Sequence, residues 1–143
     1  MPDTVAFAAD HAGFELKDAL IPVLREMGYE VLDLGTNRRD SVDYPIYGEA
    51  VAKAMQEGRA KWGVLVCGTG IGISIAANRH RHVRAALCHD STTARLARQH
   101  NDANVLVLGG RLIGVDVAKD CVKAFFTTDW EGGRHAKRVA LLS

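Results

Sequence analysis

Short apolar runs alternate with segments of helical spacing from one end of the chain to the other, and this alternation constrains the fold more than any other feature. The runs of strand length lie at residues 4–9, 30–34, 63–67, 83–88 and 104–108. Such runs, separated by helices, are typical of a parallel sheet that is covered by helices on both faces. The sequence therefore predicts an α/β fold.

The segments between these runs carry helix starts and stops. Residues 43–45 (Asp-Tyr-Pro) combine a capping residue with a proline near the first turn, and Gly28 and Gly58 follow two other apolar helical patterns. Pro22 lies inside the first helical segment, where we expect it to kink or loosen the helix. The expected helices cover residues 14–27, 43–58, 73–78, 91–99, 115–126 and 133–142.

Length and composition indicate one globular domain, which we place at residues 1–143. Hydrophobic residues make up 48% of the chain and charged residues 24%, which is not the composition of a disordered protein. The 18 Lys and Arg nearly balance the 17 Asp and Glu, and only 6% of the residues are aromatic. Proteins that bind nucleic acids need basic patches or aromatic stacking platforms, so we expect no nucleic-acid partner.

The cysteines and the uncharged segments indicate a cytoplasmic protein. Three cysteines without short spacings form neither a disulfide framework nor a zinc knuckle, which suggests a reducing compartment. No basic segment precedes an apolar run near the N-terminus, so we expect no signal peptide. The longest uncharged stretch, residues 62–78, is broken by glycines and is shorter than the ~20 apolar residues of a membrane-spanning helix.

The strongest local motif is a glycine loop at residues 67–74 (CGTGIGIS). Glycines at alternate positions after a strand let backbone N–H groups point into a concavity that can hold a phosphate or a developing oxyanion. The motif is not a dinucleotide fingerprint, because Ile73 stands where the third glycine would be, and no P-loop lysine follows. A purely structural tight turn is the alternative.

Cys67 ends a strand and adjoins this loop. A thiol near the start of a helix can act as a base or a nucleophile. The alternative is a small buried apolar side chain, the usual role of a free cysteine. Cys88, at the end of another strand, and Cys121, on the apolar face of a helix, are expected in the core.

Ligands of open parallel sheets bind at the carboxyl ends of the strands. Four marked segments lie at or beside these ends and are expected to converge: Asp10-His11, Cys67 with its loop, His100-Asn101 and Arg111. An aspartate can accept hydrogen bonds from sugar hydroxyls, and a histidine can move protons near neutral pH. A capping Asp10 beside an exposed His11, and a polar turn at His100, are the structural alternatives.

Arg134 and Arg138 are four residues apart and would share one face of a helix. Two neighbouring guanidinium groups repel each other unless an anion binds between them, which favours phosphate recognition. A solvated basic face is the alternative. The remaining histidines have no metal-ligand spacing and are expected mostly at the surface: His80, His82, His89 and His135. We therefore expect no metal.

Taken together, these residues resemble the ribose/galactose isomerase family, in particular its B-type members that act on ribose 5-phosphate. The matching segments are ADHAG (9–13), DYP (43–45), CGTGIGISIAAN (67–78), RQHNDANVL (98–106), GGR (109–111) and EGGRHAKRV (131–139). The resemblance implies a Rossmann-like three-layer α/β/α sandwich with a five-stranded parallel sheet. It also implies homodimers or tetramers, a C-terminal helix used in dimerisation, and active sites composed from two subunits.

The resemblance implies a role for each marked residue. Cys67 matches the catalytic base, and His100 matches the residue that opens the furanose ring. The anion hole for the enediolate matches Gly68, Thr69, Gly70, Ile71 and Gly72, and Thr69 is expected to help position the base or a hydroxyl. The substrate-binding positions match Asp10, His11, Asn101, Arg111, Arg134 and Arg138.

In the dimer, His100, Asn101 and Arg111 are expected from one subunit and Cys67 from the other. The resemblance leaves open which subunit supplies Arg134 and Arg138.

The implied reaction interconverts ribose 5-phosphate and ribulose 5-phosphate through a cis-enediolate. It requires one base, one oxyanion site and a phosphate clamp, and no cofactor. Allose 6-phosphate and galactose 6-phosphate are alternative substrates. A non-catalytic module that binds sugar phosphates would use the glycine loop and the arginines but would leave Cys67 and His100 without a role.

Overall fold

Five parallel strands form a single sheet in the order β2-β1-β3-β5-β4. The computed structural model describes residues 2–142. The strands are β1 (Thr4–Ala9), β2 (Glu30–Asp33), β3 (Trp62–Cys67), β4 (Ala85–Leu87) and β5 (Val105–Gly109). The parallel five-stranded sheet confirms the fold class that the alternation of strands and helices predicts.

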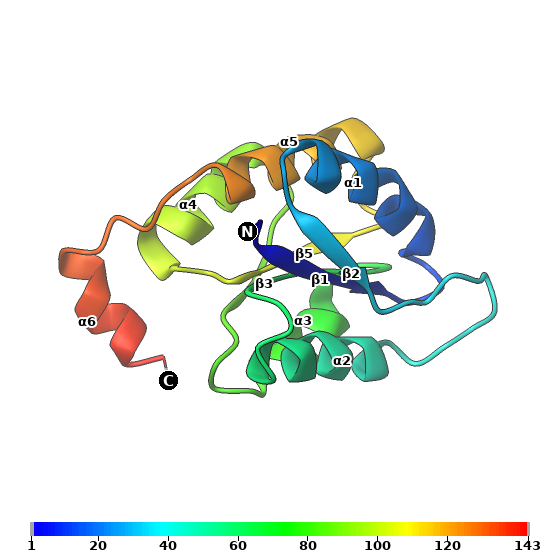
Figure 1. Ribbon diagram of the computed structural model, residues 1–143, viewed down its shortest axis with the longest axis horizontal. Coiled ribbons are helices and arrows are strands. Elements are labelled where there is room, and N and C mark those ends of the chain that lie inside the picture. Colours follow the sequence, from blue (N-terminus) through cyan, green and yellow to red (C-terminus); the bar gives the residue numbers. More distant parts are fainter. Residues whose placement is uncertain (1, 143) are drawn as a thin grey trace.

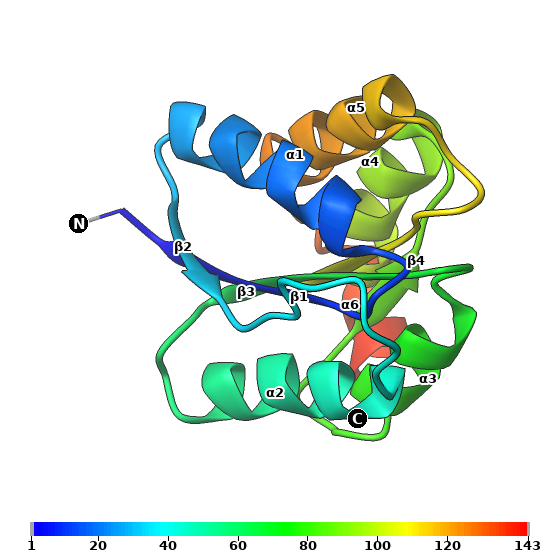
Figure 2. The same ribbon diagram turned by 90° about the vertical axis from the view of Figure 1, so that its right-hand side faces the viewer.

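The helices form two layers around the sheet. Helices α1 (Phe14–Glu26), α4 (Ser91–Asn101) and α5 (Val115–Phe126) cover one face, and α2 (Tyr44–Gln56) and α3 (Ile71–Asn78) cover the other (Figure 1, Figure 2). Each face of the sheet therefore has its own hydrophobic core.

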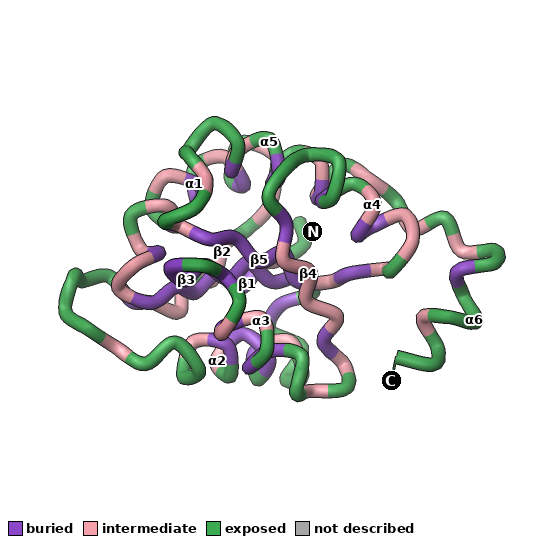
Figure 3. The backbone as a smooth tube through the Cα atoms, turned by 180° about the vertical axis from the view of Figure 1, so that it is seen from behind, coloured by how far each residue is buried: buried purple, intermediate pink, exposed green. Residues whose placement is uncertain are grey.

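The side chains of the strands supply the two cores alternately. Val5 and Phe7 of β1 pack with α1 and α5, whereas Ala6 and Ala8 pack with α2. Successive side chains of a strand point to opposite faces, so a strand that is covered on both sides is apolar throughout. This explains the continuous apolar runs of the sequence and the buried sheet between the two layers (Figure 3).

The connection between β1 and β3 reverses the direction in which the sheet grows. The chain passes from β1 to β2 on one side and then returns to place β3 on the other side of β1. In open parallel sheets, the carboxyl ends of the strands at such a switch point leave a crevice between diverging loops. Here those ends are Ala9 and Cys67, which places Asp10 and the glycine loop at the mouth of the crevice.

The segment between β2 and α2 is fastened near both of its ends. The ammonium group of Lys17, which is fully buried, lies 2.9 Å from the side-chain oxygen of Asn37. Farther along, the amide of Val42 donates a hydrogen bond to Nδ1 of His11 at 3.1 Å. Only residues 38–41 lie between these two anchors.

Helix α6 (Arg134–Ala140) lies apart from the two layers and packs against the end of α4 (Figure 1). His135 is the buried residue of this helix, so the expectation that His135 lies at the surface is wrong. Beyond it the chain is exposed, with Leu141 at 77% and Leu142 at 62%. A helix this short is marginal on its own, so its contact with α4 contributes to its stability.

Several element boundaries differ from the sequence prediction. Strand β4 begins only at Ala85, because the amide of Arg84 donates to the side-chain oxygen of Asn104 at 2.7 Å. Helix α4 continues through His100 and ends at Asn101, two residues later than expected. Among residues 2–142, no helix is both long enough and apolar enough to cross a membrane.

Candidate active site

A cavity of about 510 Å³ lies at the switch point, between the loops that follow β1, β3 and β5. It brings together eight residues of the predicted site: Asp10, His11, Cys67, Gly68, Thr69, Ile71, Gly72 and Arg111. These residues come from three separate parts of the sequence. The rule that ligands bind at the carboxyl ends of parallel strands therefore locates this half of the site correctly.

Cys67 is the last residue of β3, and its sulfur faces the first turn of α3. The amide of Gly70 donates a hydrogen bond to Cys67 Sγ at 3.2 Å. The two other cysteines are buried in the core on the α5 side of the sheet. Burial raises the pKa of the Cys88 thiol to about 12 and that of the Cys121 thiol to about 11, so both stay protonated at neutral pH. Only Cys67 adjoins the cavity.

The glycine loop is shorter than the sequence predicts. Helix α3 begins at Ile71, so the loop is residues 68–70 and Gly72 belongs to the helix. The first amides of a helix have no carbonyl partner within it, and the amide of Gly72 is among them. The start of α3, with Ile71 and Gly72, thus gives the cavity a positively polarised wall, and the anion-hole assignment stays a prediction.

Gly70 is required by both its conformation and its surroundings. Its φ is +79°, and a Cβ atom there would lie 2.5 Å from Cδ1 of Leu87 and 3.1 Å from the carbonyl of Leu108. Gly58 has nearly the same φ, +76°, but its Cβ would meet nothing within 4 Å. The two glycines therefore separate the cost of a left-handed backbone from the cost of crowding.

We expect Gly58→Ala to lower the free energy of unfolding by about 1–2 kcal/mol, the cost of a left-handed alanine. Gly70→Ala should cost about 1–3 kcal/mol more, because its Cβ overpacks the site. Urea unfolding of the two variants measures the difference. Equal losses in the two proteins would contradict the close packing of the loop against β4 and β5.

Asp10 and His11 follow β1 and face the cavity. Asp10 is 5% exposed, and its Oδ1 accepts a hydrogen bond from the amide of Ala12 at 2.9 Å. His11 Nδ1 accepts from the amide of Val42, so this nitrogen carries no proton. The other ring nitrogen of a neutral His11 must then hold the proton, which makes it a donor for an anion or a hydroxyl group.

Arg111 and Thr69 complete this half of the site. A Cβ atom on Gly68 would lie 3.3 Å from the guanidinium of Arg111, so the arginine extends across the glycine loop. The amide of Arg111 also donates to the carbonyl of Gly68 at 2.9 Å. Thr69 is exposed, and its Oγ1 accepts from the amide of Ile71 at 3.1 Å. Arg111 therefore belongs to the same subunit as Cys67, and the expectation that it comes from the other subunit is wrong.

The remaining predicted residues lie elsewhere in the chain. His100 and Asn101 end α4, immediately before β5 begins, whereas Cys67 pairs with Gly109 at the far end of β5. The five residues of β5 alone span roughly 15 Å. His100 and Asn101 precede β5 instead of following it. They thus lie near the amino ends of the strands, whereas the cavity lies at the carboxyl ends. The expected convergence of all four segments within one chain is wrong.

Arg134 and Arg138 lie on α6 with exposed side chains, on the side of the molecule where α4 ends. They therefore accompany His100, and not the cavity that holds Cys67. The chain presents two separate groups of predicted site residues, one after the carboxyl ends of β1, β3 and β5 and the other on α4 and α6. Helix α6 lies beside the end of α4, away from the start of α1 that follows β1 (Figure 1).

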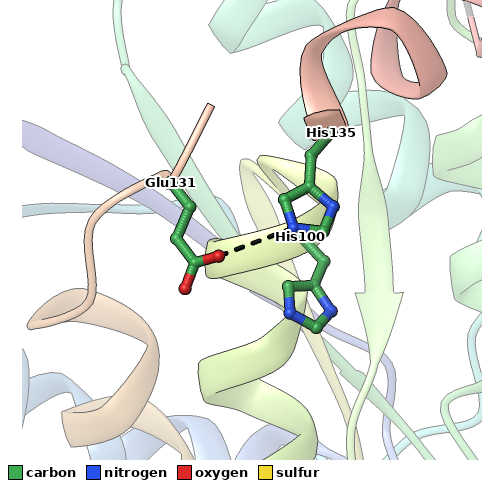
Figure 4. Close-up of side chains that lie close together, drawn as sticks. All are labelled: His100, Glu131 and His135. Carbon is green, nitrogen blue, oxygen red and sulfur yellow. Dashed lines mark ion pairs between the residues drawn. The ribbon is translucent and has the colours of Figure 1, made fainter. Parts of the chain in front are cut away.

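His100 has two neighbours that the sequence pattern does not single out. Its ring stacks on that of His135, with centroids 4.4 Å apart and planes 16° from parallel. Glu131 Oε1 lies 3.5 Å from His135 Nε2 (Figure 4). Burial lowers the pKa of His135, and His100 and Arg134 lower it further, whereas Glu131 raises it. The sequence pattern does not single out His135, because its burial depends on how α6 packs against α4.

Tyr44 was also missed as a site residue. Tyr44 lines the cavity, and a Cβ atom on Gly72 would lie only 2.5 Å from the Tyr44 ring. The Asp-Tyr-Pro segment that contains it predicts the start of α2 correctly, at Tyr44. No local pattern indicates this second role, because it depends on the packing of Tyr44 against Gly72 of α3.

Comparison with known proteins relates the chain to one family. A family model described as Ribose/Galactose Isomerase matches residues 5–142. Ribose-5-phosphate isomerase B of Escherichia coli is 46% identical over 139 residues, which are 97% of this chain and 93% of that protein.

Solved structures agree over the whole chain. A ribose 5-phosphate isomerase of Thermotoga maritima is 49% identical with a TM-score of 0.94, and the match covers 98% of this chain and 97% of that one. The type B ribose 5-phosphate isomerase of Trypanosoma brucei is 43% identical with a TM-score of 0.96, covering 99% and 97%. By sequence, fold and extent of the match, the chain belongs to the ribose/galactose isomerase family.

Proposed function

We propose that the protein interconverts ribose 5-phosphate and ribulose 5-phosphate, with Cys67 as the base. One observation carries the proposal. The Cys67 sulfur, which accepts a hydrogen bond from the Gly70 amide at 3.2 Å, adjoins a cavity that the first residues of α3, Ile71 and Gly72, also line. An acceptor for a carbon-bound proton thus lies beside donors for the negative charge that develops on oxygen. The relatives that bear the name ribose-5-phosphate isomerase B support the choice of substrate.

The proposed chemistry requires one proton acceptor and one oxyanion site. The Cys67 thiolate removes the C2 proton of the open-chain aldose, and the electron pair forms the C1–C2 double bond of a cis-enediolate. The charge that develops on O1 is stabilised by amides of the glycine loop and α3. The proton then returns to C1, while the O2 proton moves to O1, and the ketose is complete. Thr69, at the rim, positions a substrate hydroxyl.

The working site is proposed to form between two copies of the chain. Ring opening is assigned to His100, yet His100 lies near the amino ends of the strands, and the cavity of its own chain lies at their carboxyl ends. Tyr44, Ile71 and Ile75 line that cavity and are 41–53% exposed. An apolar rim of this kind marks an interaction surface. A second copy that brings α6 and the end of α4 to this rim covers both exposed surfaces at once.

In such a dimer one subunit supplies Asp10, His11, Cys67, Thr69 and Arg111. The other supplies the residues of α4 and α6: His100, Asn101, Arg134 and Arg138. A two-fold dimer contains two such sites. Arg134 and Arg138 then hold the phosphate, far from the reacting carbons, where their binding energy orients the substrate.

Removal of the phosphate clamp should act mainly on KM. We expect Arg138→Ala to lose about 1.5–3 kcal/mol of charge-assisted binding, which raises KM for ribose 5-phosphate by about 10- to 150-fold. Lys137→Ala, at an exposed neighbouring position of α6, removes the same charge and should change KM little. If Arg138→Ala and Arg134→Ala both keep the parent KM, the phosphate binds elsewhere.

The proposed function is tested by turnover of a substrate panel. The protein is expected to show its highest kcat/KM with ribose 5-phosphate, measured by the absorbance of ribulose 5-phosphate, compared with allose 6-phosphate and galactose 6-phosphate. Exhaustively chelated protein should retain this activity, because no step requires a Lewis acid. Preference for a hexose phosphate would reassign the substrate, and binding of all three without turnover would indicate the non-catalytic module.

A further inference from the structure

The residues around His100 include one buried polar atom without a partner. His135 is only 6% exposed, and its Nε2 has no hydrogen-bond partner among the residues that the structure describes. The Glu131 carboxylate lies 3.5 Å from this nitrogen but is not oriented to accept a hydrogen bond from it. Buried polar atoms in native proteins nearly always have partners, so an unpaired ring nitrogen indicates a missing one.

The missing partner fits a metal ion. His100, Glu131 and His135 each offer one ligand atom, and these three atoms lie within 4.8 Å of one another (Figure 4). A tetrahedral zinc ion with bonds of about 2.0–2.1 Å holds its ligand atoms roughly 3.3 Å apart. The pair formed by His135 and Glu131 is already at 3.5 Å. Only His100, on the last turn of α4, has to approach.

The ligand set selects the kind of ion. Two imidazoles and one carboxylate suit zinc and its neighbours in the transition series, whereas calcium and magnesium prefer oxygen ligands throughout. Three protein ligands leave a fourth position for water. Arg134 and Arg138 add positive charge nearby, so the negative charge of Glu131 is needed to balance the ion.

Binding of an ion must turn the His100 ring. An imidazole binds a metal in the plane of its own ring, and two rings that are 16° from parallel and 4.4 Å apart cannot both point at one ion. His135 is buried, and His100 is only partly buried, so His100 is the ring that moves. A ring nitrogen of His100 that binds the ion cannot exchange protons with a sugar.

We infer that His100, Glu131 and His135 form an inhibitory site for a divalent transition-metal ion, zinc in particular, which withdraws His100 from ring opening. The effect on catalysis rests on the proposed function, whereas the binding of the ion does not. The reaction requires no metal, and the site acts only when zinc is available. Zinc therefore blocks the aldose-to-ketose direction.

Direct binding is tested with cobalt(II), which reports tetrahedral coordination by its visible absorption. The titration uses metal-free Cys67→Ala protein, so that no cavity thiolate can bind the ion. We expect one cobalt per chain, displaced by one zinc. Glu131→Gln in this background should weaken binding by more than about 100-fold, since loss of a partner outside the ligand set already costs 10- to 100-fold. His135→Gln should do the same.

Glu49→Gln is the matched control. Glu49 Oε2 lies 2.9 Å from His80 Nε2, and His82 adjoins His80 at 5.9 Å between ring centroids, so this is a second carboxylate beside two histidines. It is not arranged to hold an ion, and Glu49→Gln should bind cobalt as the parent does. Absence of binding in the parent background, or unchanged binding in Glu131→Gln, would overturn the site.

The regulatory effect is tested on the protein with Cys67 intact. Free zinc at ten times the measured Kd should occupy about nine tenths of the sites and lower turnover of ribose 5-phosphate accordingly, whereas Glu131→Gln should lose only about a tenth of its activity. Equal inhibition of both proteins would overturn the inhibitory role. Lack of turnover in metal-free protein would instead refute the proposed function, and the cobalt titration would still decide the site.

Discussion

A Cys67→Ala protein is expected to fold and to bind sugar phosphate as the parent does, while its kcat falls by about 10²- to 10⁴-fold, the usual contribution of a general base. The substitution removes the atom that accepts the C2 proton. It leaves the amides of α3 and the phosphate arginines in place, so KM should change little. Steady-state kinetics, with circular dichroism and thermal unfolding as checks on the fold, measure the effect.

The other two cysteines provide the controls. Cys88→Ala and Cys121→Ala remove side chains that are 1% and 0% exposed, so they should lower stability more than kcat. Iodoacetamide should inactivate the parent by modifying Cys67, and a substrate analogue should protect it. A folded Cys67→Ala protein whose kcat stays within a few-fold of the parent would refute the assignment of the base.

Mixing two inactive proteins should restore about a quarter of full activity. Cys67→Ala changes a residue at the carboxyl ends of the strands, and His100→Ala changes one near their amino ends. The two lesions therefore lie in different halves of the proposed composite site. Random exchange of equal amounts makes half of the dimers mixed, and in each mixed dimer one site has both lesions and the other has none. Turnover after exchange, with the mixed dimers counted by native mass spectrometry, gives the result.

A second mixture tests the assignment of Arg111. The Arg111 guanidinium crosses the glycine loop of its own chain, so Arg111→Ala and Cys67→Ala damage the same half of the site. Their mixture should gain no activity beyond that of the separate proteins. Confirmed exchange without recovery in the first mixture would show that each site lies within one chain.

The sequence predicts the fold well, because the relevant signals are local. An apolar run of five or six residues, a glycine after it and a periodic helix each depend on a few neighbouring residues. The prediction fails where a long-range contact decides. The start of β4 depends on the side chain of Asn104, some twenty residues from Arg84, and Gly70 at the start of α3 packs against Leu87 and Leu108.

The placement of the candidate site could be predicted only for the residues that follow strands. The residues after β1, β3 and β5 meet because parallel strands share one carboxyl edge. His100 has the residue type of the site but precedes its strand, and periodicity does not indicate how far it lies from the cavity. The inward turn of His135 depends on how α6 docks on α4, which no local pattern encodes.

The two anchors of the segment between β2 and α2 have a consequence for how this scaffold can diverge. The buried Lys17 holds the side chain of Asn37, and the ring of His11 holds the backbone of Val42, so the stretch between them can change in length while the sheet stays as it is. Surface loops tolerate such insertions at small entropic cost. Lineages can therefore lengthen or shorten the chain at residues 38–41 alone, next to residues that line the cavity, without rebuilding the sheet that carries the site.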